Sequence, residues 1–266
     1  PFSNPNSKAW EVFNGVKKSW PEQVTVLDNT ATDVLPNSMF WGFVNNNMAL
    51  VKVLEARKQT YWFTDAPYFG RFDNNNLKPD NHYWRICKNR IHVPFIKGCK
   101  SDRFEKFGMK VKAPNFKGKY ILVCPSSPNI NEYLGKPNWT QETVEQIKRY
   151  SDRPIKVREK PRGRGTSGPS EAIVPLSEDL KDAWVCVTSC SISAVEAQCM
   201  GIPTICDVKS FAEPVSTNHF ADIENPYFVE IITSLRIPEK TSPISFSLFP
   251  FPYMSAVSKK LIPTSY

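Results

Sequence analysis

A run of hydroxyl side chains lies between an apolar strand and a helix in the segment 184–205. Ser189, Ser191 and Ser193 follow the predicted strand, and Glu196 lies within the first turn of the predicted helix. A hydroxyl-rich loop at a helix N-terminus offers backbone N–H groups and a favourable dipole to a phosphate. The Glu196 carboxylate can accept hydrogen bonds from two vicinal hydroxyls, such as those of a ribose. The alternative is an acidic side chain that only interacts with the helix dipole.

The helix is followed by a Gly-x-Pro turn at 201–203 and a second apolar strand. This order of strand, hydroxyl loop, helix with Glu-Ala, and Gly-x-Pro resembles the donor-binding signature of glycosyltransferases of the GT-B fold. The resemblance covers residues 119–206, about a third of the chain. It implies that Glu196 binds the ribose of a nucleoside diphosphate sugar and that the three serines lie near the diphosphate.

Two cationic side chains end the predicted strand 155–158. Arg158 and Lys160 share one side of the chain there, because side chains repeat every two residues along a strand. Cations at the carboxyl edge of a parallel sheet are well placed to clamp a diphosphate, and similar sugar transferases carry a basic strand end at this place. We therefore expect both residues to bind the donor. The loop 162–168 either closes over the donor or stays solvated.

A second hydroxyl pair, Ser126 and Ser127, follows the predicted strand 119–124. In proteins of the GT-B fold, small hydroxyl residues at this place commonly meet the donor. By that resemblance we assign both serines to the donor site.

A carboxylate ends an apolar strand in the first half of the chain. Asp65 follows Thr60–Thr64 and precedes an aromatic loop that contains Tyr68, Phe69 and Arg71. A carboxylate at the carboxyl end of a strand suits a general base that deprotonates a hydroxyl. Asp65 is the predicted catalytic base, and the three loop residues are predicted to line the acceptor. The alternative is a turn-forming Asp, which is common before Ala-Pro.

Aromatic and basic side chains alternate from Tyr83 to Asn89. This interleaving is typical of a nucleic-acid groove or a pocket for a flipped base, and we expect Tyr83, Arg85 and Asn89 to contact the acceptor. The stretch looks like segments of phage-encoded glycosyltransferases, some of which act on hydroxymethylated bases in DNA. The alternative is an ordinary strand with one face in the core.

Positive charge is concentrated in two blocks of a chain whose net charge is +8. Residues 85–119 hold eleven Lys or Arg against two acidic residues, a net of +9, and residues 146–165 hold eight against two, a net of +6. The remaining residues therefore carry 8 − 15 = −7. Fixed cations of this kind attract phosphates and polyanions. The alternative is a solvated, lysine-rich face.

Other compositional features narrow the class of protein. The 266 residues contain 41% hydrophobic and 23% charged residues, which is typical of globular proteins. The seven cysteines sit partly in apolar runs, so we expect reduced thiols in the core, and a zinc site has little support in their spacing. No Asp-x-Asp pair is present, so the resemblance to GT-B enzymes implies catalysis without a metal. No apolar run is long enough to span a membrane, and no signal peptide is visible, so we expect a cytoplasmic protein.

Helices and strands alternate along the chain, which predicts an α/β fold with mostly parallel sheets. The resemblance implies two Rossmann-like lobes of GT-B type with a cleft between them: an acceptor lobe at 1–114, a donor lobe at 115–225 and a tail at 226–266 that crosses back to the first lobe. We expect helices at 7–19, 47–58, 140–150, 177–181 and 193–200, and strands at 24–28, 39–44, 60–65, 119–124, 155–158, 183–187 and 203–206.

The predicted function is transfer of a sugar from a nucleoside diphosphate sugar, most readily a UDP-sugar, to a hydroxyl. The preferred acceptor is a hydroxymethylated pyrimidine in DNA, which would place a viral enzyme in the host cytoplasm. A cell-surface glycan is the second acceptor. A nucleotide-sugar epimerase and a DNA-binding protein without turnover are the alternatives from other classes. The residues leave open the sugar, the nucleotide, the stereochemistry and the oligomeric state.

Overall fold

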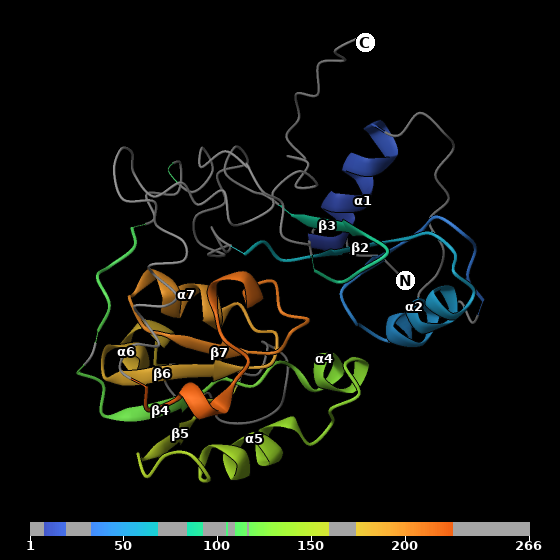
Figure 1. Cartoon of the computed structure of the whole chain (residues 1–266). Coiled ribbons are helices and arrows are strands. Elements are labelled where there is room, and N and C mark those ends of the chain that lie inside the picture. The colour runs from blue at the N-terminus through green and yellow to red at the C-terminus, as the bar shows by residue number, and fades with distance from the viewer. Residues whose placement is uncertain are drawn as a thin grey trace. The chain divides into compact units, whose positions relative to one another are not determined.

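The computed structural model describes residues 8–19, 33–68, 84–92, 105, 110–115, 117–159 and 174–225 (Figure 1). The chain divides into two compact units. Among the described residues, 8–92 belong to the first unit and 105–225 to the second. Each unit has its own sheet.

Within its described residues, the first unit combines two helices with a three-stranded mixed sheet in the order β1-β2-β3. Strands β1 and β2 are parallel, whereas β3 runs antiparallel to β2 and pairs Arg85 with Asp65. The prediction of mostly parallel sheets therefore does not hold for β3. In chain order the elements are α1 (Lys8–Ser19), β1 (Ser38–Trp41), α2 (Asn47–Ala56), β2 (Tyr61–Asp65) and β3 (Arg85–Lys88).

Turn geometry explains where the predicted elements of the first unit end early. The predicted strand 39–44 stops at Trp41 because Gly42 takes a positive φ of 52°. The predicted helix 47–58 stops at Ala56, and Lys58 adopts the left-handed region. The helix predicted at 7–19 is confirmed as α1. The strand predicted at 24–28 lies outside the described residues.

The second unit contains a four-stranded sheet in the order β5-β4-β6-β7, in which all neighbouring strands are parallel. Short helices connect the strands. In chain order the elements are β4 (Tyr120–Val123), α4 (Pro128–Tyr133), α5 (Trp139–Ile147), β5 (Ile155–Val157), α6 (Leu176–Lys181), β6 (Ala183–Thr188), α7 (Ser193–Cys199), β7 (Thr204–Cys206), and the 3-10 helices η2 (Glu213–Val215) and η3 (Phe220–Asp222).

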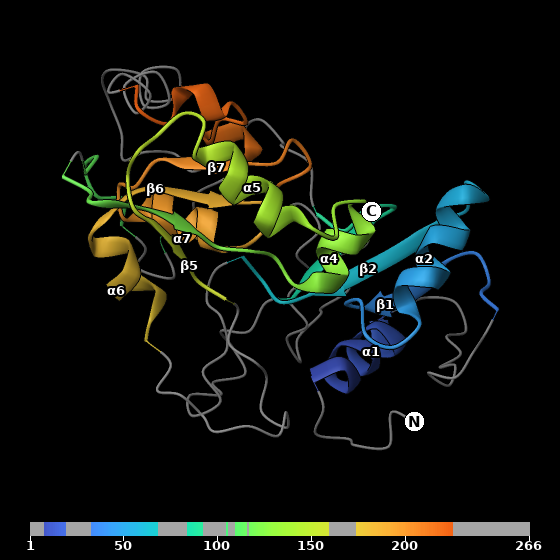
Figure 2. The same ribbon diagram turned by 90° about the horizontal axis from the view of Figure 1, so that it is seen from below.

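Alternation along β4 and β6 gives the second sheet an apolar layer on each face. Ile121 and Val187 belong to a cluster that includes Trp139 and Ile147 of α5. Leu122 belongs to the other cluster, which packs against α6 and α7. Helix α5 therefore covers one face of the sheet, and α6 and α7 cover the opposite face (Figures 1 and 2). The fold of this unit is α/β, as predicted. The six cysteines within the described residues are buried thiols, and the sequence predicted that cysteines would lie in the core.

Two helices of the second unit differ from what the sequence predicts. Helix α5 begins at Trp139, one residue before its predicted start, and its N-cap Asn138 makes no side-chain hydrogen bond. Helix α4 was not predicted, because its sequence lies directly after a Ser-Ser-Pro turn signal. Pro128 occupies the first turn of α4, where its missing N–H is tolerated.

The segment 110–115 packs against the second unit. The backbone N–H of Lys112 donates to the Cys199 carbonyl at 2.9 Å, and that of Asn115 donates to the Gly201 carbonyl at 2.9 Å. The predicted boundary after residue 114 therefore falls inside a segment that is bound to α7, and the division of the chain lies earlier. None of the helices formed by the described residues is long and apolar enough to cross a membrane.

Candidate functional site

The two strands at the centre of the second sheet define a topological switch point. The connection from β4 leads outward to β5 through α5, and the connection from β6 leads the other way to β7 through α7 on the opposite face. In open α/β sheets, ligands bind outside the carboxyl ends of the strands at such a point. The loops 124–127 and 189–192 follow β4 and β6 there, so both predicted serine loops reach this edge.

A buried hydrogen-bond network joins the two loops. The Ser189 hydroxyl lies 2.7 Å from the Ser126 hydroxyl and 2.8 Å from Oδ1 of Asn131, and the Cys190 N–H donates to the Ser126 hydroxyl at 3.0 Å. Ser189 is 0% exposed and Ser126 is 7% exposed. These two hydroxyls therefore hold the loops together, and their own contact with a ligand has no support in the structure. Ser127 is partly exposed at the N-terminus of α4.

The loop before α7 satisfies several of its own N–H groups. The Ser191 N–H donates to the Thr188 hydroxyl at 3.2 Å, and the Ser193 N–H donates to the Ser191 hydroxyl at 3.3 Å. Ser193 is buried, whereas Ser191 is partly exposed and Glu196 is exposed on α7. Of the predicted residues of this segment, Ser191 and Glu196 are therefore the two that a ligand can reach.

Arg158 extends from the carboxyl end of β5 toward α6. Its guanidinium donates to Oδ2 of Asp179 and, at 2.6 Å, to the Val174 carbonyl. Lys156, two residues earlier on the same side of the strand, donates to Oδ1 of Asp179 at 2.6 Å. Lys160, the predicted partner of Arg158, lies outside the described residues. The two-residue spacing therefore pairs Arg158 with Lys156 instead of Lys160. Both cations bind the Asp179 carboxylate, which the sequence analysis missed.

The Asp179 carboxylate is 7% exposed and is held between these two cations. Burial alone would raise its pKa, but the hydrogen bonds from Lys156 and Arg158 lower the pKa below the ordinary value for Asp. The hydrogen bond with Asp179 likewise raises the pKa of Lys156. Both shifts favour the charged forms, so the cluster is an ionised triad of two cations and one anion.

A second ion pair lies at the same edge of the sheet. Lys136, which follows α4, pairs with Asp207, which follows β7, and the Asp207 N–H donates to the Ser189 carbonyl at 3.1 Å. Sequence reasoning missed both residues, because they are 71 positions apart and carry no motif. The available signal was that both residues follow elements that end at the carboxyl edge of the sheet.

Asp65 lies at the carboxyl end of β2 in the first unit, as predicted. Its Oδ1 accepts the Ala66 N–H at 2.7 Å, and its Oδ2 accepts from Arg85 at 3.0 Å. The Asp65 side chain is 37% exposed, whereas that of Arg85 is 4% exposed. Arg85 therefore contacts the predicted base from the interior instead of presenting its charge to an acceptor.

Tyr68 and His92 complete the surroundings of Arg85. The guanidinium lies 4.9 Å from the centre of the Tyr68 ring and 2.8 Å from Nδ1 of His92. Burial, together with the charge of Arg85, lowers the pKa of His92 well below its ordinary value, so this imidazole is neutral at pH 7. Nδ1 then accepts the hydrogen bond from Arg85, which assigns the ring proton to Nε2. Burial opposes the charge of Arg85, but Tyr68 and Asp65 hold its pKa above the ordinary value.

Asn89, another predicted acceptor residue, does not lie near Asp65. Asn89 follows β3 at the opposite end of the sheet, where its backbone and side chain pair with Tyr61 and its φ is 56°. It acts there as a turn residue. Phe69, Arg71 and Tyr83 lie outside the described residues.

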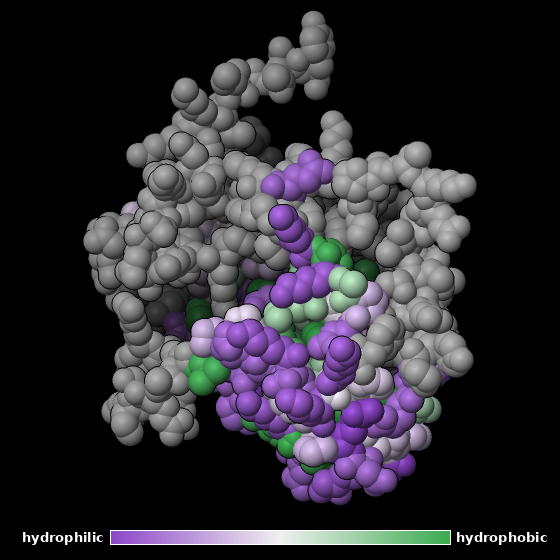
Figure 3. Space-filling view, turned by 90° about the vertical axis from the view of Figure 1, so that its left-hand side faces the viewer, coloured by the Kyte–Doolittle hydropathy of each residue, from purple (hydrophilic) through white to green (hydrophobic). Residues whose placement is uncertain are grey.

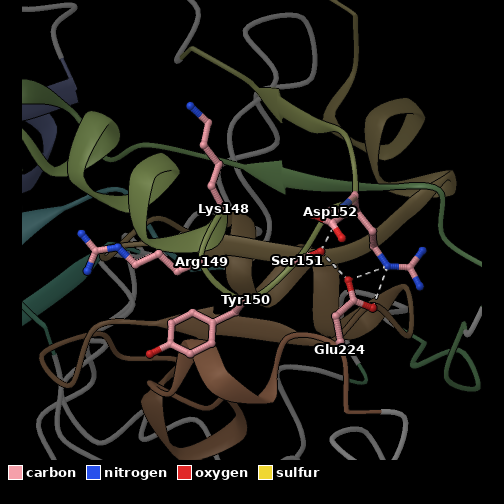
Figure 4. Close-up of a pocket in the computed structure, with 7 residues that line it drawn as sticks. Lys148, Arg149, Tyr150, Ser151, Asp152 and Glu224 are labelled. Atoms are coloured by element: carbon pink, nitrogen blue, oxygen red, sulfur yellow. Dashed lines mark hydrogen bonds and ion pairs between the residues drawn. The ribbon is translucent and has the colours of Figure 1, made fainter.

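An open depression of about 620 Å³ lies at the amino edge of the second sheet (Figure 4). Ser151 and Arg153 both bond to Glu224, while Lys148 and Arg149 point away from that cluster. Arg153 also stacks on the Trp184 ring at 4.0 Å. Three cations and two carboxylates line the depression, which gives its lining a net charge of +1. The charged groups that face inward, Arg153 and Glu224, bond to one another. This arrangement favours a structural role.

Within the described residues, no group of three or more His, Cys, Asp or Glu side chains is placed to hold a metal ion. The chain was also compared with known proteins. Neither the scan against protein-family models nor the search of curated proteins found a match. The functional assignment therefore depends on the geometry of the polar groups at the carboxyl edge of the second sheet and of the residues around Asp65.

Proposed function

We propose that the chain is a glycosyltransferase that moves a sugar from a nucleoside diphosphate sugar to a hydroxyl acceptor. One observation carries the proposal: the polar loops after β4 and β6 meet at the switch point of a parallel sheet. That is the place at which α/β sheets of this topology bind nucleotides. The resemblance of residues 119–206 to the GT-B donor signature narrows the ligand to an activated sugar.

The donor contacts in this proposal come from the members of the site that are at least partly exposed. Arg158 faces the diphosphate and offsets the charge that grows on it as the sugar leaves. Glu196 accepts the ribose hydroxyls, and Ser191 and Ser127 line the phosphates. Ser126 and Ser189 keep the two loops in register, because both are buried and bonded to each other.

Asp65 is the proposed base, and it takes the proton of the acceptor hydroxyl as that oxygen attacks the sugar carbon. The Ala66 N–H and Arg85 fix the orientation of its carboxylate, and more than a third of the side chain stays exposed for the acceptor. Arg85 is thus a positioning residue in this proposal. The preferred acceptor is a hydroxymethylated pyrimidine in DNA, on the strength of the two basic blocks of the sequence.

A transfer assay tests the proposal. The full chain is incubated with labelled UDP-, GDP- and CDP-sugars and with duplex DNA that contains hydroxymethylcytosine, plain DNA, or a glycan. We expect label on the modified DNA only. Epimerised donor without acceptor, or salt-sensitive DNA binding without transfer, would point to the two alternative classes and contradict the proposal.

Asp65→Asn removes the base while keeping the shape of the side chain. We expect transfer to fall by at least about 100-fold with donor affinity unchanged, as measured by initial rates and by titration of UDP. Asp33→Asn is the matched control, because Asp33 is an exposed carboxylate of the same unit that pairs with Arg57. Equal rates for the Asp65 variant and the wild type would remove Asp65 from the mechanism.

A further inference from the structure

The ionised triad of Lys156, Arg158 and Asp179 has two different ends. Arg158 follows the last residue of β5, at the edge where ligands bind, whereas Lys156 lies in the middle of the strand, about 7 Å further from that edge. Asp179 sits between them on α6, and the Tyr120 hydroxyl donates to its carbonyl at 2.5 Å. The carboxylate therefore links a cation at the ligand-binding edge to a cation that lies behind it.

The triad is not an ordinary exposed ion pair. The Asp179 side chain is 7% exposed and that of Arg158 is 16% exposed, so solvent screens their interaction only weakly. The Lys156 side chain is 49% exposed and reaches in from the surface. Polar residues dominate the described surface on the side of the unit where α6 lies (Figure 3). A buried carboxylate needs compensating partners, and here each carboxylate oxygen has its own cation.

The charges of the triad sum to 2 − 1 = +1. Without Asp179 the same cations would present +2 to an anion at the carboxyl edge. Without Lys156 the charge of Arg158 would be matched by the carboxylate, and the sum would be zero. The carboxylate and the lysine therefore have opposite effects on the attraction that Arg158 exerts on a phosphate.

We propose that Asp179 and Lys156 together set the anion affinity of the donor site through Arg158, and that the Asp179 carboxylate reduces the gain in affinity that the additional charge of a nucleoside triphosphate brings. Lys156 is a positioning residue in this scheme, because it neutralises Asp179 and leaves the charge of Arg158 available. The inference rests on the proposed function. It adds that the carboxylate weakens the electrostatic preference for nucleoside triphosphates, because their extra charge gains most from a site with a larger positive sum.

Opposite directions of change distinguish this role from a purely structural one. A structural triad loses stability when either partner is replaced, and ligand affinity then falls in both variants. The proposed role predicts that Asp179→Asn strengthens nucleotide binding and that Lys156→Gln weakens it. Lys156→Arg keeps the charge and should restore the affinity of the wild type.

The experiment is titration of UDP and UTP into the full chain at fixed ionic strength, followed by calorimetry or fluorescence. We expect Asp179→Asn to bind UDP about three- to tenfold more tightly and to shift the UTP-to-UDP preference toward UTP. We expect Lys156→Gln to bind UDP about three- to tenfold more weakly. Asp182→Asn is the matched control, since Asp182 is an exposed carboxylate directly after α6 that pairs with Lys119.

Three outcomes decide the matter. If the wild type binds neither nucleotide, the proposed function fails together with this inference. If the wild type binds UDP but both variants bind it more weakly, or both bind it equally well, the inference fails and the proposed function stands. Should Asp179→Asn not fold, the half-exposed Lys156 series still decides, because unchanged UDP affinity in Lys156→Gln would overturn the inference.

Discussion

The two edges of the second sheet are both rich in charged and hydroxyl side chains, yet they are built differently. At the amino edge, backbone segments pack closely: a Cβ on Gly118 would lie 2.2 Å from the Trp184 Cα, and one on Gly201 would lie 2.1 Å from the Ala113 carbonyl oxygen. Arg153 and Glu224 then close that edge over Trp184. At the carboxyl edge, side chains from three strand ends meet instead, and buried hydroxyls and ion pairs connect the loops.

This difference teaches that charge alone does not mark a ligand site. The amino edge holds the open depression and several cations. These cations all lie in the short segment directly after α5, and they bond largely to neighbours that stabilise the fold. The carboxyl edge draws its polar groups from distant parts of the chain, and it includes buried carboxylates whose neutralisation depends on a few partners. Topology, which places the switch point there, separates the two edges.

Glycine substitutions should give the largest difference in stability between the two edges. Gly201 and Gly135 have nearly equal positive φ values of 75° and 74°, but Gly135, near the carboxyl edge, has no atom within 4 Å of an added Cβ. Gly201→Ala must displace the Ala113 backbone in addition to the conformational strain. We expect Gly201→Ala to lower the free energy of unfolding by about 3 kcal/mol or more, and Gly135→Ala by about 1 kcal/mol, in urea denaturation. Equal losses would mean that segment 110–115 does not pack as described.

Replacing a buried hydroxyl at the carboxyl edge should have the next largest effect. Ser189→Ala removes the group that bonds to Ser126 and Asn131 and leaves the Asn131 oxygen buried without that donor. We expect a loss of about 1–3 kcal/mol, measured by hydrogen exchange of the β4 and β6 amides. Ser177→Ala, at an exposed position on α6, is the control and should change the exchange little. An unaffected Ser189 variant would show that the two loops are not held by this network.

Lowering the pH should have the smallest effect on the stability of the carboxyl edge. The pKa of Asp179 is lower in the folded protein than in the unfolded chain, so its ion pairs contribute stability above the ordinary Asp pKa of 3.8 and lose it as the pH falls through the folded value. The stability difference between the wild type and Asp179→Asn should therefore be constant near neutral pH and narrow below about pH 4. Urea denaturation at several pH values measures it, and a difference that stays constant to pH 2 would contradict the assignment.

Much of the second unit could be predicted from local pattern. The strands β4, β6 and β7 and the helix α7 follow from apolar runs and turn signals, and β5 with its basic end follows from period-two spacing. Helix α4 and the cap of α5 could not be predicted, because Ser-Ser-Pro and Asn-Trp-Thr are equally compatible with turns. In the first unit, the sequence around β3 is compatible with a nucleic-acid groove or with an ordinary strand, because alternating aromatic and basic residues suit either role.

The side chains of the candidate site were predicted by type but not by partner. The sequence places Asp65 at a strand end, but only the antiparallel pairing of β3 brings Arg85 onto its carboxylate and carries Asn89 to the other end. Likewise Arg158 was predicted from its strand, whereas Asp179 approaches it from a helix 21 residues away.

The sequence by itself therefore determined most of the elements, the alternation that buries both faces of the second sheet, and the residues at the strand ends. These properties depend on neighbours a few positions apart, and short-range spacing specifies them. Only the tertiary structure decided which hydroxyls are buried, which charges neutralise one another and which edge holds the switch point. Burial and pairing depend on strand order and helix packing, which bring together residues that no local pattern relates.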